Sequence, residues 1–201
     1  MDLREYENRL YKLGYKNIGG TDEVGRGPLI GPVVAACCVL PSNFELEGLT
    51  DSKKLSEKKR DIFYEYLINN TIYGIGIVSE EEIDKINIYE ASRKAMMMAI
   101  KEVKKQIKLE YVLSDAMPLI DLDIPYEAII KGDSKSISIA AASVIAKVTR
   151  DRMMIELDKK YPMYGFKKHK GYPTKDHIEA IKKYGLIEGY RKTYKPIKEM
   201  L

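Results

Sequence analysis

Four acidic residues stand beside apolar segments of the chain, at places where a carboxylate can do chemistry. Asp22 and Glu23 end one such segment. Asp115 follows a second, and Asp133 lies between a third and a long helical stretch. Adjacent strand residues point to opposite faces, so one of the first pair should be buried, which is costly for a carboxylate unless it is paired, hydrogen-bonded or bound to a metal. Considered without the rest of the sequence, Asp22 and Glu23 are more ordinarily solvated acids at a strand end. Asp133 by itself is equally well explained as an acid at a helix start, where the helix dipole favours it.

Acids at separate strand ends can converge at one edge of a sheet, where open α/β sheets bind their ligands. A carboxylate set without histidine or cysteine favours hard cations such as Mg²⁺ or Mn²⁺. Two such ions about 4 Å apart activate water and stabilise the leaving oxygen in phosphodiester hydrolysis. The four acids are therefore consistent with a hydrolytic metal site, although spacing alone does not establish it.

A turn rich in glycine and proline follows the first acid pair. Gly25 and Gly27 flank Arg26. These glycines let the backbone approach a ligand closely, and the arginine offers a charged fork suited to phosphate. The turn also allows a different hypothesis, a phosphate-cradling nucleotide enzyme. That hypothesis is weak, because the sequence has no Gly-Lys-Ser/Thr element and the turn leads into a strand rather than a helix.

The charge of the chain is divided unevenly along its length. Its 201 residues suit one domain with a small appendage, and the formal net charge is +4. Residues 143–201 carry 15 basic and 7 acidic side chains, whereas residues 1–142 carry 19 and 23. A basic C-terminal part suits a polyanionic partner, and the acidic remainder suits cations.

Several other classes of protein are excluded. The longest apolar run, Leu29 to Leu40, is interrupted by Gly31 and Pro32 and is far shorter than the roughly 20 residues that cross a bilayer. The charged N-terminal segment is unlike a signal peptide. Cys37 and Cys38 are adjacent, which predicts buried reduced thiols in a cytoplasmic protein rather than a disulfide or a zinc site.

Hydrophobic patterning predicts the elements that must position the acids. The expected strands are Asn17–Val24, Val33–Leu40, Thr71–Ser79, Glu110–Ser114 and Tyr126–Ile130. The expected helices are 2–14, Ser56–Ile68, Ser79–Lys105, Ile137–Lys160 and Thr174–Tyr184. Ser56 and Ser79 are expected N-caps, and Met96–Met98 is expected to fill the core. The class is α/β with a mixed sheet and a helical, basic C-terminal end.

Four motifs, in order along nearly the whole chain, resemble those of the type 2 ribonuclease H family, which includes bacterial ribonuclease HII. They are Thr21–Pro32, Asp51–Ser56, Lys131–Ser134 with the helix Ala140–Asp151, and Tyr164–Phe166 with His169–Thr174. Two positions depart from the family pattern: Thr50 stands where asparagine is frequent, and Ala116 where glycine is common. The sister family, ribonuclease HIII, has an additional N-terminal domain and a Gly-Lys-Gly turn. Arg26 and the short segment 1–16 before the first expected strand favour the HII family.

The resemblance implies a ribonuclease H-like fold, a mixed five-stranded sheet flanked by helices with a helical C-terminal extension. Residues 1–160 would form the catalytic domain, with a short N-terminal helix in 1–16, and residues 161–201 a basic helical extension packed on it. The implied enzyme is a cytoplasmic endoribonuclease, a monomer without membrane contact, that hydrolyses the RNA strand of RNA–DNA hybrids. It also cuts 5′ to single ribonucleotides in duplex DNA, leaving 3′-hydroxyl and 5′-phosphate ends, with two Mn²⁺ or Mg²⁺ ions. Its implied roles are removal of ribonucleotides from DNA and removal of RNA primers.

The resemblance also assigns the site residues. The catalytic, metal-binding acids are Asp22, Glu23, Asp115 and Asp133. Substrate would be bound by Gly25, Arg26 and Gly27, which sense the 2′-hydroxyl, by the junction-sensing Tyr172, and by Ser52, Lys53, Lys54 and Lys147. The ordinary alternatives are a core tyrosine and solvated lysines, and His169 is expected to be packed rather than catalytic. A hybrid-binding protein that has lost catalysis is the competing function, and the presence of all four acids argues against it.

Overall fold

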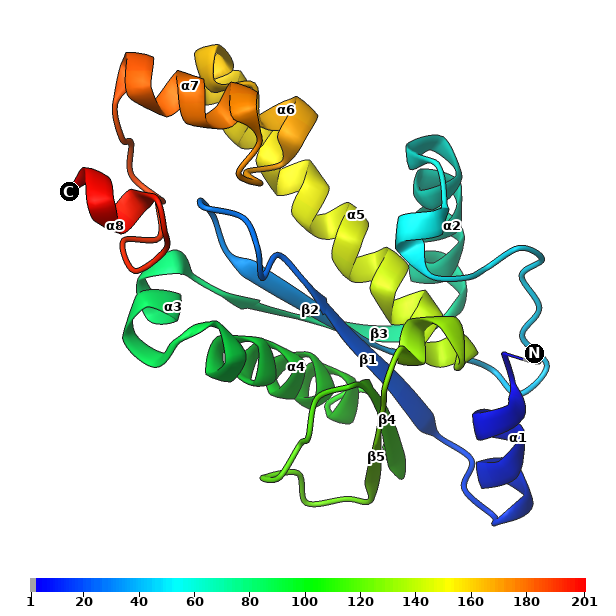
Figure 1. Ribbon diagram of the computed structural model, residues 1–201. Helices are drawn as coiled ribbons and strands as arrows, with labels where there is room; N and C mark the ends of the chain where they lie inside the picture. The colour runs from blue at the N-terminus through cyan, green and yellow to red at the C-terminus, as the bar shows by residue number, and fades with distance from the viewer. Residues whose placement is uncertain (1–2) are drawn as a thin grey trace.

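A computed structural model describes residues 3–201 and shows one five-stranded sheet between helices (Figure 1). The strand order is β3-β2-β1-β4-β5, with β1 in the centre. The first three strands pair antiparallel, whereas β4 and β5 run parallel to β1, so the expected mixed sheet is confirmed. The strands are β1 (Ile18–Val24), β2 (Val33–Val39), β3 (Ile72–Val78), β4 (Tyr111–Asp115) and β5 (Tyr126–Ile129).

The helices cover both faces of the sheet and one end of the molecule. They are α1 (Glu5–Lys12), α2 (Glu57–Asn70), α3 (Glu80–Ile86), α4 (Ile88–Lys104), α5 (Ile137–Lys160), α6 (Phe166–His169), α7 (Lys175–Tyr184) and α8 (Ile197–Met200). Short 3-10 turns cover Ser52–Lys54 (η1), Gly132–Ser134 (η2) and Pro162–Tyr164 (η3). The N-terminal helix is shorter than the expected 2–14, and residue 2 lies outside the described residues.

Strand β2 is buried on both faces, which explains its uninterrupted apolar sequence. Val33, Ala35 and Cys37 pack with α4 in one core cluster. Ala36 and Cys38 pack with α2 and α5 in another, so the two cysteines face opposite layers and are both free, as expected.

Two glycines allow helices to lie directly on the sheet. A Cβ at Gly76 of β3 would lie 1.9 Å from the Ala95 carbonyl oxygen in α4. A Cβ at Gly20 of β1 would lie 2.1 Å from the Ser138 carbonyl carbon in the first turn of α5. The start of α5 is therefore held against β1 two residues before Asp22.

The predicted single helical stretch Ser79–Lys105 is wrong, because it divides into α3 and α4 at Asn87. The backbone φ of Asn87 is 67°, a conformation that asparagine tolerates better than most residues. Its Oδ1 accepts hydrogen bonds from Tyr89 N (2.9 Å) and Glu90 N (3.1 Å), so it caps a new helix. The expected caps Ser56 and Ser79 are confirmed by hydrogen bonds from the third residue after each.

The prediction for Met96–Met98 is also wrong in part. Met96 is fully buried, whereas Met98 is 39% exposed, because three consecutive helical residues cannot all face the sheet. Across residues 3–201, every helix is too short or too polar to traverse a lipid bilayer.

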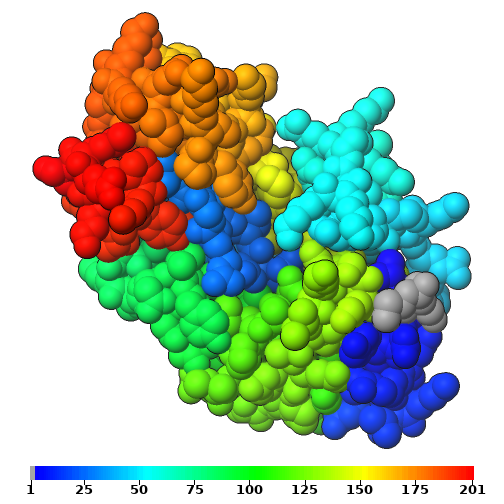
Figure 2. Space-filling view, viewed as in Figure 1, coloured from blue at the N-terminus to red at the C-terminus, as the bar shows by residue number. Residues whose placement is uncertain are grey.

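The C-terminal elements pack on the loop between β1 and β2. Leu29 and Ile30 of that loop form a core cluster with Met154 of α5 and residues of η3, α6, α7 and α8. Figure 2 shows the C-terminal segments in orange and red and α2 in cyan. Between them the surface is recessed, and atoms of the early part of the chain (blue) and of α5 (yellow) are exposed there.

Candidate active site

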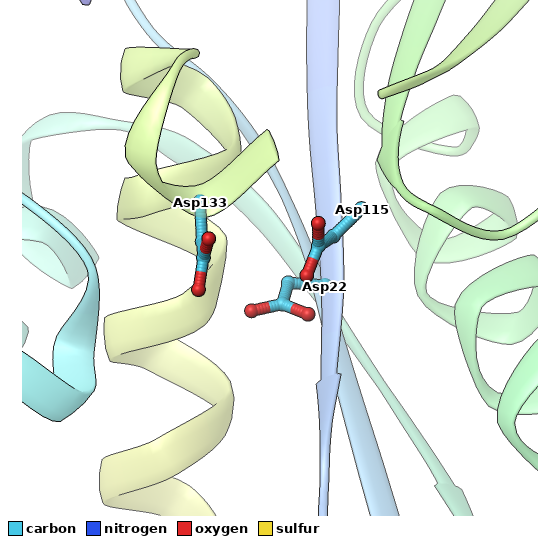
Figure 3. Close-up of side chains that lie close together, drawn as sticks. All are labelled: Asp22, Asp115 and Asp133. Atoms are coloured by element: carbon cyan, nitrogen blue, oxygen red, sulfur yellow. The ribbon is translucent and has the colours of Figure 1, made fainter. Parts of the chain in front are cut away.

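Three of the predicted acids meet where β1, β4 and η2 come together. One carboxylate oxygen from each of Asp22, Asp115 and Asp133 lies within 4.8 Å of the others. Figure 3 shows the three carboxylates pointing toward one another, Asp22 from the central strand and Asp133 from the turn before α5. The parallel pairing of Thr21 with Ser114 places Asp22 beside Asp115 one residue further on. Strand topology therefore joins residues that lie more than 90 positions apart in sequence.

Backbone N–H groups orient two of these carboxylates. Asp115 Oδ1 accepts a hydrogen bond from Gly132 N at 2.7 Å, which ties the end of β4 to η2. Asp22 Oδ1 accepts one from Glu23 N, also at 2.7 Å. The family departure at Ala116 falls at a strained position, because its φ of 53° lies in the left-handed region that favours glycine.

The acids carry little compensating positive charge. Burial raises the pKa of Asp22 well above its usual range, and the charges of Glu23, Asp115 and Asp133 raise it further. Burial also raises the pKa of Asp133, reinforced by the charges of Asp115 and Asp51. The exposed Lys53 forms a long ion pair with Asp133, with its Nζ 3.7 Å from Asp133 Oδ2. Buried oxygen ligands with unbalanced negative charge are what a hard divalent cation binds, so these residues fit the implied Mg²⁺ or Mn²⁺.

Glu23 lies next to this group but outside the three-carboxylate set. Its Oε1 is 3.4 Å from Arg26 Nη1. Burial raises the pKa of Glu23, although the Arg26 charge opposes the increase. Asp51 is an acid that the sequence analysis did not single out. Its Oδ1 accepts a hydrogen bond from Lys53 N at 2.9 Å. Its position as the first residue of the Asp51–Ser56 motif was the available signal.

Two fully buried arginines hold the loop that contains Gly25, Arg26 and Gly27, and sequence reasoning missed both. Arg191 donates to the carbonyl oxygens of Gly25 (2.7 Å), Arg26 (3.1 Å) and Gly31 (2.8 and 3.0 Å) and to Tyr194 Oη (3.1 Å). Since the loop carbonyls point inward to the buried guanidinium, Arg191 fixes the backbone of the turn from the interior of the protein.

Arg150 connects the same loop to the turn that carries Tyr172. It donates to the carbonyl oxygens of Pro32 (3.0 Å), Ile30 (3.1 Å) and Lys170 (2.9 Å). Gly25, at φ 98°, leaves room for this side chain, since a Cβ there would lie 2.4 Å from Arg150 Nε. Burial lowers the pKa of Arg150 to about 10, and the neighbouring Arg191 adds to the decrease.

The Tyr172 ring lies against the Gly-Arg-Gly turn. A Cβ at Gly27 would be 3.3 Å from Tyr172 Cε1, so the two predicted substrate-sensing features adjoin. Tyr172 is 37% exposed, which disagrees with the ordinary interpretation of a core tyrosine.

The remaining predicted substrate contacts have different surroundings. Ser52 is buried, and its N–H donates to Ser143 Oγ at 3.2 Å. Lys54 is exposed and lies in the same short turn as Lys53. Lys147 is already paired, because its Nζ lies 2.7 Å from Asp151 Oδ1 and its side chain is only 18% exposed. A phosphate would have to compete with Asp151 for this lysine.

Both histidines support the Tyr172 turn. His169 is packed, as expected, with Nε2 2.8 Å from the Tyr164 carbonyl oxygen and Nδ1 accepting from Gly171 N. His177 stacks on it at 4.3 Å, and its Nδ1 lies 2.8 Å from the Tyr172 carbonyl oxygen.

Acid is expected to destabilise the protein through His177. Burial lowers its pKa from 6.5 to about 4, so below pH 6.5 the unfolded chain binds a proton that the folded protein excludes. Between pH 7 and pH 5 this histidine alone should lower the free energy of unfolding by about 2 kcal/mol. Urea titrations at pH 7 and pH 5 would give the free energies of unfolding of the wild type and of His177→Gln. The difference between the two proteins should be about 2 kcal/mol smaller at pH 5 than at pH 7. If the free energies of unfolding of the two proteins changed with pH by the same amount, the role of His177 in the acid sensitivity would be contradicted.

The sheet topology and the acidic site define a nuclease of the ribonuclease H class, and comparison with known proteins supports this. The family model described as Ribonuclease HII matches residues 19–196. Ribonuclease HII of Bacillus cytotoxicus and that of Bacillus mycoides are each 54% identical over 202 residues, covering 100% of this chain and 77% of the relative. The chain belongs to the ribonuclease HII family and is a ribonuclease H hydrolase.

Solved structures agree with this fold. Ribonuclease H2 from Pyrococcus horikoshii has a TM-score of 0.76 at 28% identity, covering 92% of this chain and 96% of that one. Archaeoglobus fulgidus RNase HII, solved in a complex with PCNA, has a TM-score of 0.72 at 27% identity, covering 89% and 95%. Bst-RNase HIII in complex with Mn²⁺, at 16% identity and a TM-score of 0.69 over 94% of this chain and 70% of that one, shares the fold.

Proposed function

We propose that this ribonuclease H cuts on the 5′ side of single ribonucleotides in duplex DNA, as well as within the RNA strand of RNA–DNA hybrids. The observation that carries the proposal is the position of the three-carboxylate set relative to the loop that Arg191 holds. Asp22 lies three residues before Gly25 on the same strand and turn, so a strand bound along the turn would present its phosphate to the acids.

Asp22, Glu23, Asp115 and Asp133 would hold the cations, two Mg²⁺ or Mn²⁺ ions in our proposal. When bound, such ions supply Lewis-acid activation of water and stabilisation of the leaving 3′-oxygen. The chain itself contributes the buried negative charge that attracts cations and the fixed geometry of the carboxylates.

Recognition of the ribonucleotide is assigned to the Gly-Arg-Gly turn. A 2′-hydroxyl both donates and accepts hydrogen bonds and is the local difference between RNA and DNA. Because Arg191 donates to the carbonyl oxygens of Gly25 and Arg26, we assign the contacts with the ribose and its phosphate to the backbone N–H groups of the turn. The exposed ring of Tyr172 would pack on the following sugar and favour deoxyribose there, since a 2′-hydroxyl would be crowded. Lys53 and Lys54 would contact phosphates without reading sequence.

A cleavage assay tests this function directly. The substrates are a DNA duplex with one ribonucleotide, an RNA–DNA hybrid and an all-DNA duplex of the same sequence as the control. With Mg²⁺ or Mn²⁺ the first two should be cut, leaving 3′-hydroxyl and 5′-phosphate ends, and EDTA should stop the reaction. Binding of the hybrid without cleavage in either ion would instead support the non-catalytic alternative.

Other features of the proposal remain predictions. They include a monomeric state, a cytoplasmic location, and roles in ribonucleotide removal from DNA and in RNA primer removal. The division into a catalytic domain of residues 1–160 and an extension of residues 161–201 is likewise a prediction. The core cluster that joins Leu29 and Ile30 to the C-terminal helices supports the packing of this extension on the catalytic domain.

A further inference from the structure

Glu7 of α1 has a buried carboxylate that lies outside the three-carboxylate set. The residue is 3% exposed, and its Oε1 accepts three hydrogen bonds. The donors are Ser136 Oγ and Ser138 Oγ, each at 2.5 Å, and Ser138 N at 3.1 Å. Its Oε2 is buried without a hydrogen-bond partner among the described residues. Burying a carboxylate costs free energy, so its position here indicates a role beyond packing α1 on the protein.

The three donors belong to the beginning of α5. Ser136 is the N-cap of that helix, where its own Oγ accepts a hydrogen bond from Ile139 N at 3.2 Å. The helix is 24 residues long, and a negative charge near its N-terminus is favoured by the unpaired N–H groups and the dipole there. A second attachment comes from the same N-terminal segment, since Ile137 N donates to the Leu3 carbonyl oxygen at 2.8 Å.

This attachment lies three residues after Asp133. Ser136 N donates to the Gly132 carbonyl oxygen at 2.8 Å, which closes the short turn containing Asp133. On the other side of that turn, Gly132 N donates to Asp115 Oδ1 at 2.7 Å. Asp133 therefore sits between two fixed points, one provided by an acid of the site and the other by Glu7.

We infer that Glu7 is a positioning residue for Asp133. Through Glu7, α1 fixes the position of the start of α5, and so of the preceding turn with Asp133, relative to the other acids of the site. The inference rests on the proposed function of that site. Removing the Glu7 carboxylate leaves two hydroxyls and one N–H without their acceptor, so the turn and its aspartate can shift relative to Asp22 and Asp115. The consequence is a weaker and less ordered cation site rather than a loss of duplex binding.

The test compares Glu7→Ala and Glu7→Gln with two matched controls. Glu5→Ala removes an exposed carboxylate from the same helix, and Val103→Ala weakens the buried core on the opposite side of the sheet. Mn²⁺ binding to the free protein is measured by titration calorimetry. The kcat and KM values are measured on a duplex with one ribonucleotide, at a temperature where each variant is folded. Thermal unfolding is followed in parallel.

We expect Glu7→Ala to weaken Mn²⁺ binding about tenfold and to lower kcat by a similar factor, with KM changed less than about twofold. Glu7→Gln, which keeps one acceptor oxygen, should show a smaller change in the same direction, and it decides the question if the alanine variant does not fold. Glu5→Ala should match the wild type, and Val103→Ala should lose stability with unchanged Mn²⁺ affinity.

Wild-type Mn²⁺ affinity and kcat in both Glu7 variants would overturn the inference while leaving the proposed function intact. A decrease in Mn²⁺ affinity of equal size in Val103→Ala would also overturn it, since the loss would then follow stability. A wild-type protein that neither binds Mn²⁺ nor cleaves would overturn the proposed function itself and the inference with it.

Discussion

Asp22→Asn is expected to slow cleavage severely and, in EDTA, to raise the unfolding temperature. Asp22 is buried among acids, and burial together with their charges raises its pKa well above the usual range. A carboxyl group whose folded pKa is raised destabilises the folded protein at neutral pH, where it must carry its charge. Asparagine removes that charge at nearly constant volume but cannot replace the carboxylate as an anionic ligand.

We expect kcat to fall by about three orders of magnitude, the scale of losing one preorganised charge-stabilising group. A gain of about 1 kcal/mol in EDTA corresponds to a rise of about 2–4 °C in the unfolding temperature for a chain of this size. Single-turnover cleavage with Mg²⁺ and calorimetric melting in EDTA measure the two effects.

Two further variants complete this experiment. Asp121→Asn removes an exposed carboxylate whose surface ion pair with Arg93 contributes little, so both properties should stay near the wild type. Asp133→Asn should lose turnover as Asp22→Asn does, while it still binds the duplex. Near-normal cleavage by either site variant would refute the assignment of the acids.

Arg191→Lys is expected to lower both the stability of the protein and the rate of cleavage at a single ribonucleotide. A lysine keeps the charge but cannot fork across the carbonyls of Gly25, Arg26 and Gly31. Buried carbonyls without donors cost about 1–3 kcal/mol each, so the loss in free energy of unfolding should be about 3 kcal/mol. The turn would also lose its fixed backbone, and kcat/KM on the duplex with one ribonucleotide should fall about a hundredfold.

Urea unfolding and steady-state cleavage at a temperature where the variant is folded would measure these losses. The exposed neighbour Lys192 offers a matched control, and Lys192→Gln should change neither property appreciably. An Arg191→Lys protein with wild-type unfolding and cleavage would show that the guanidinium is not needed to hold the turn.

Local pattern was sufficient for most of the secondary structure. The double-sided apolar run of β2, the alternation in β3 and the serine caps of α2 and α3 each depend on residues that are neighbours in the chain, so they could be predicted. The break at Asn87 could not, because a side-chain cap in mid-helix competes with continued helix by a small free energy that periodicity does not measure.

The site divides in the same way. The amino-acid sequence by itself determined the family, and it predicted the acids Asp22, Glu23, Asp115 and Asp133 and the turn that follows the first pair. Only the tertiary structure decided that the carboxylates of Asp22, Asp115 and Asp133 lie together, while Glu23 pairs with Arg26. It also decided that Lys147 is occupied by Asp151 and that the Tyr172 ring lies on Gly27.

The supporting residues were beyond the reach of sequence reasoning. Arg191 donates to carbonyls about 160 positions away, and Glu7 accepts from serines about 130 positions away. An arginine or glutamate is normally a solvated surface residue, so its type carries no signal that it is buried. Burial of these groups depends on which backbone oxygens and N–H groups the assembled sheet and helices leave without partners, and that is known only once the chain has folded.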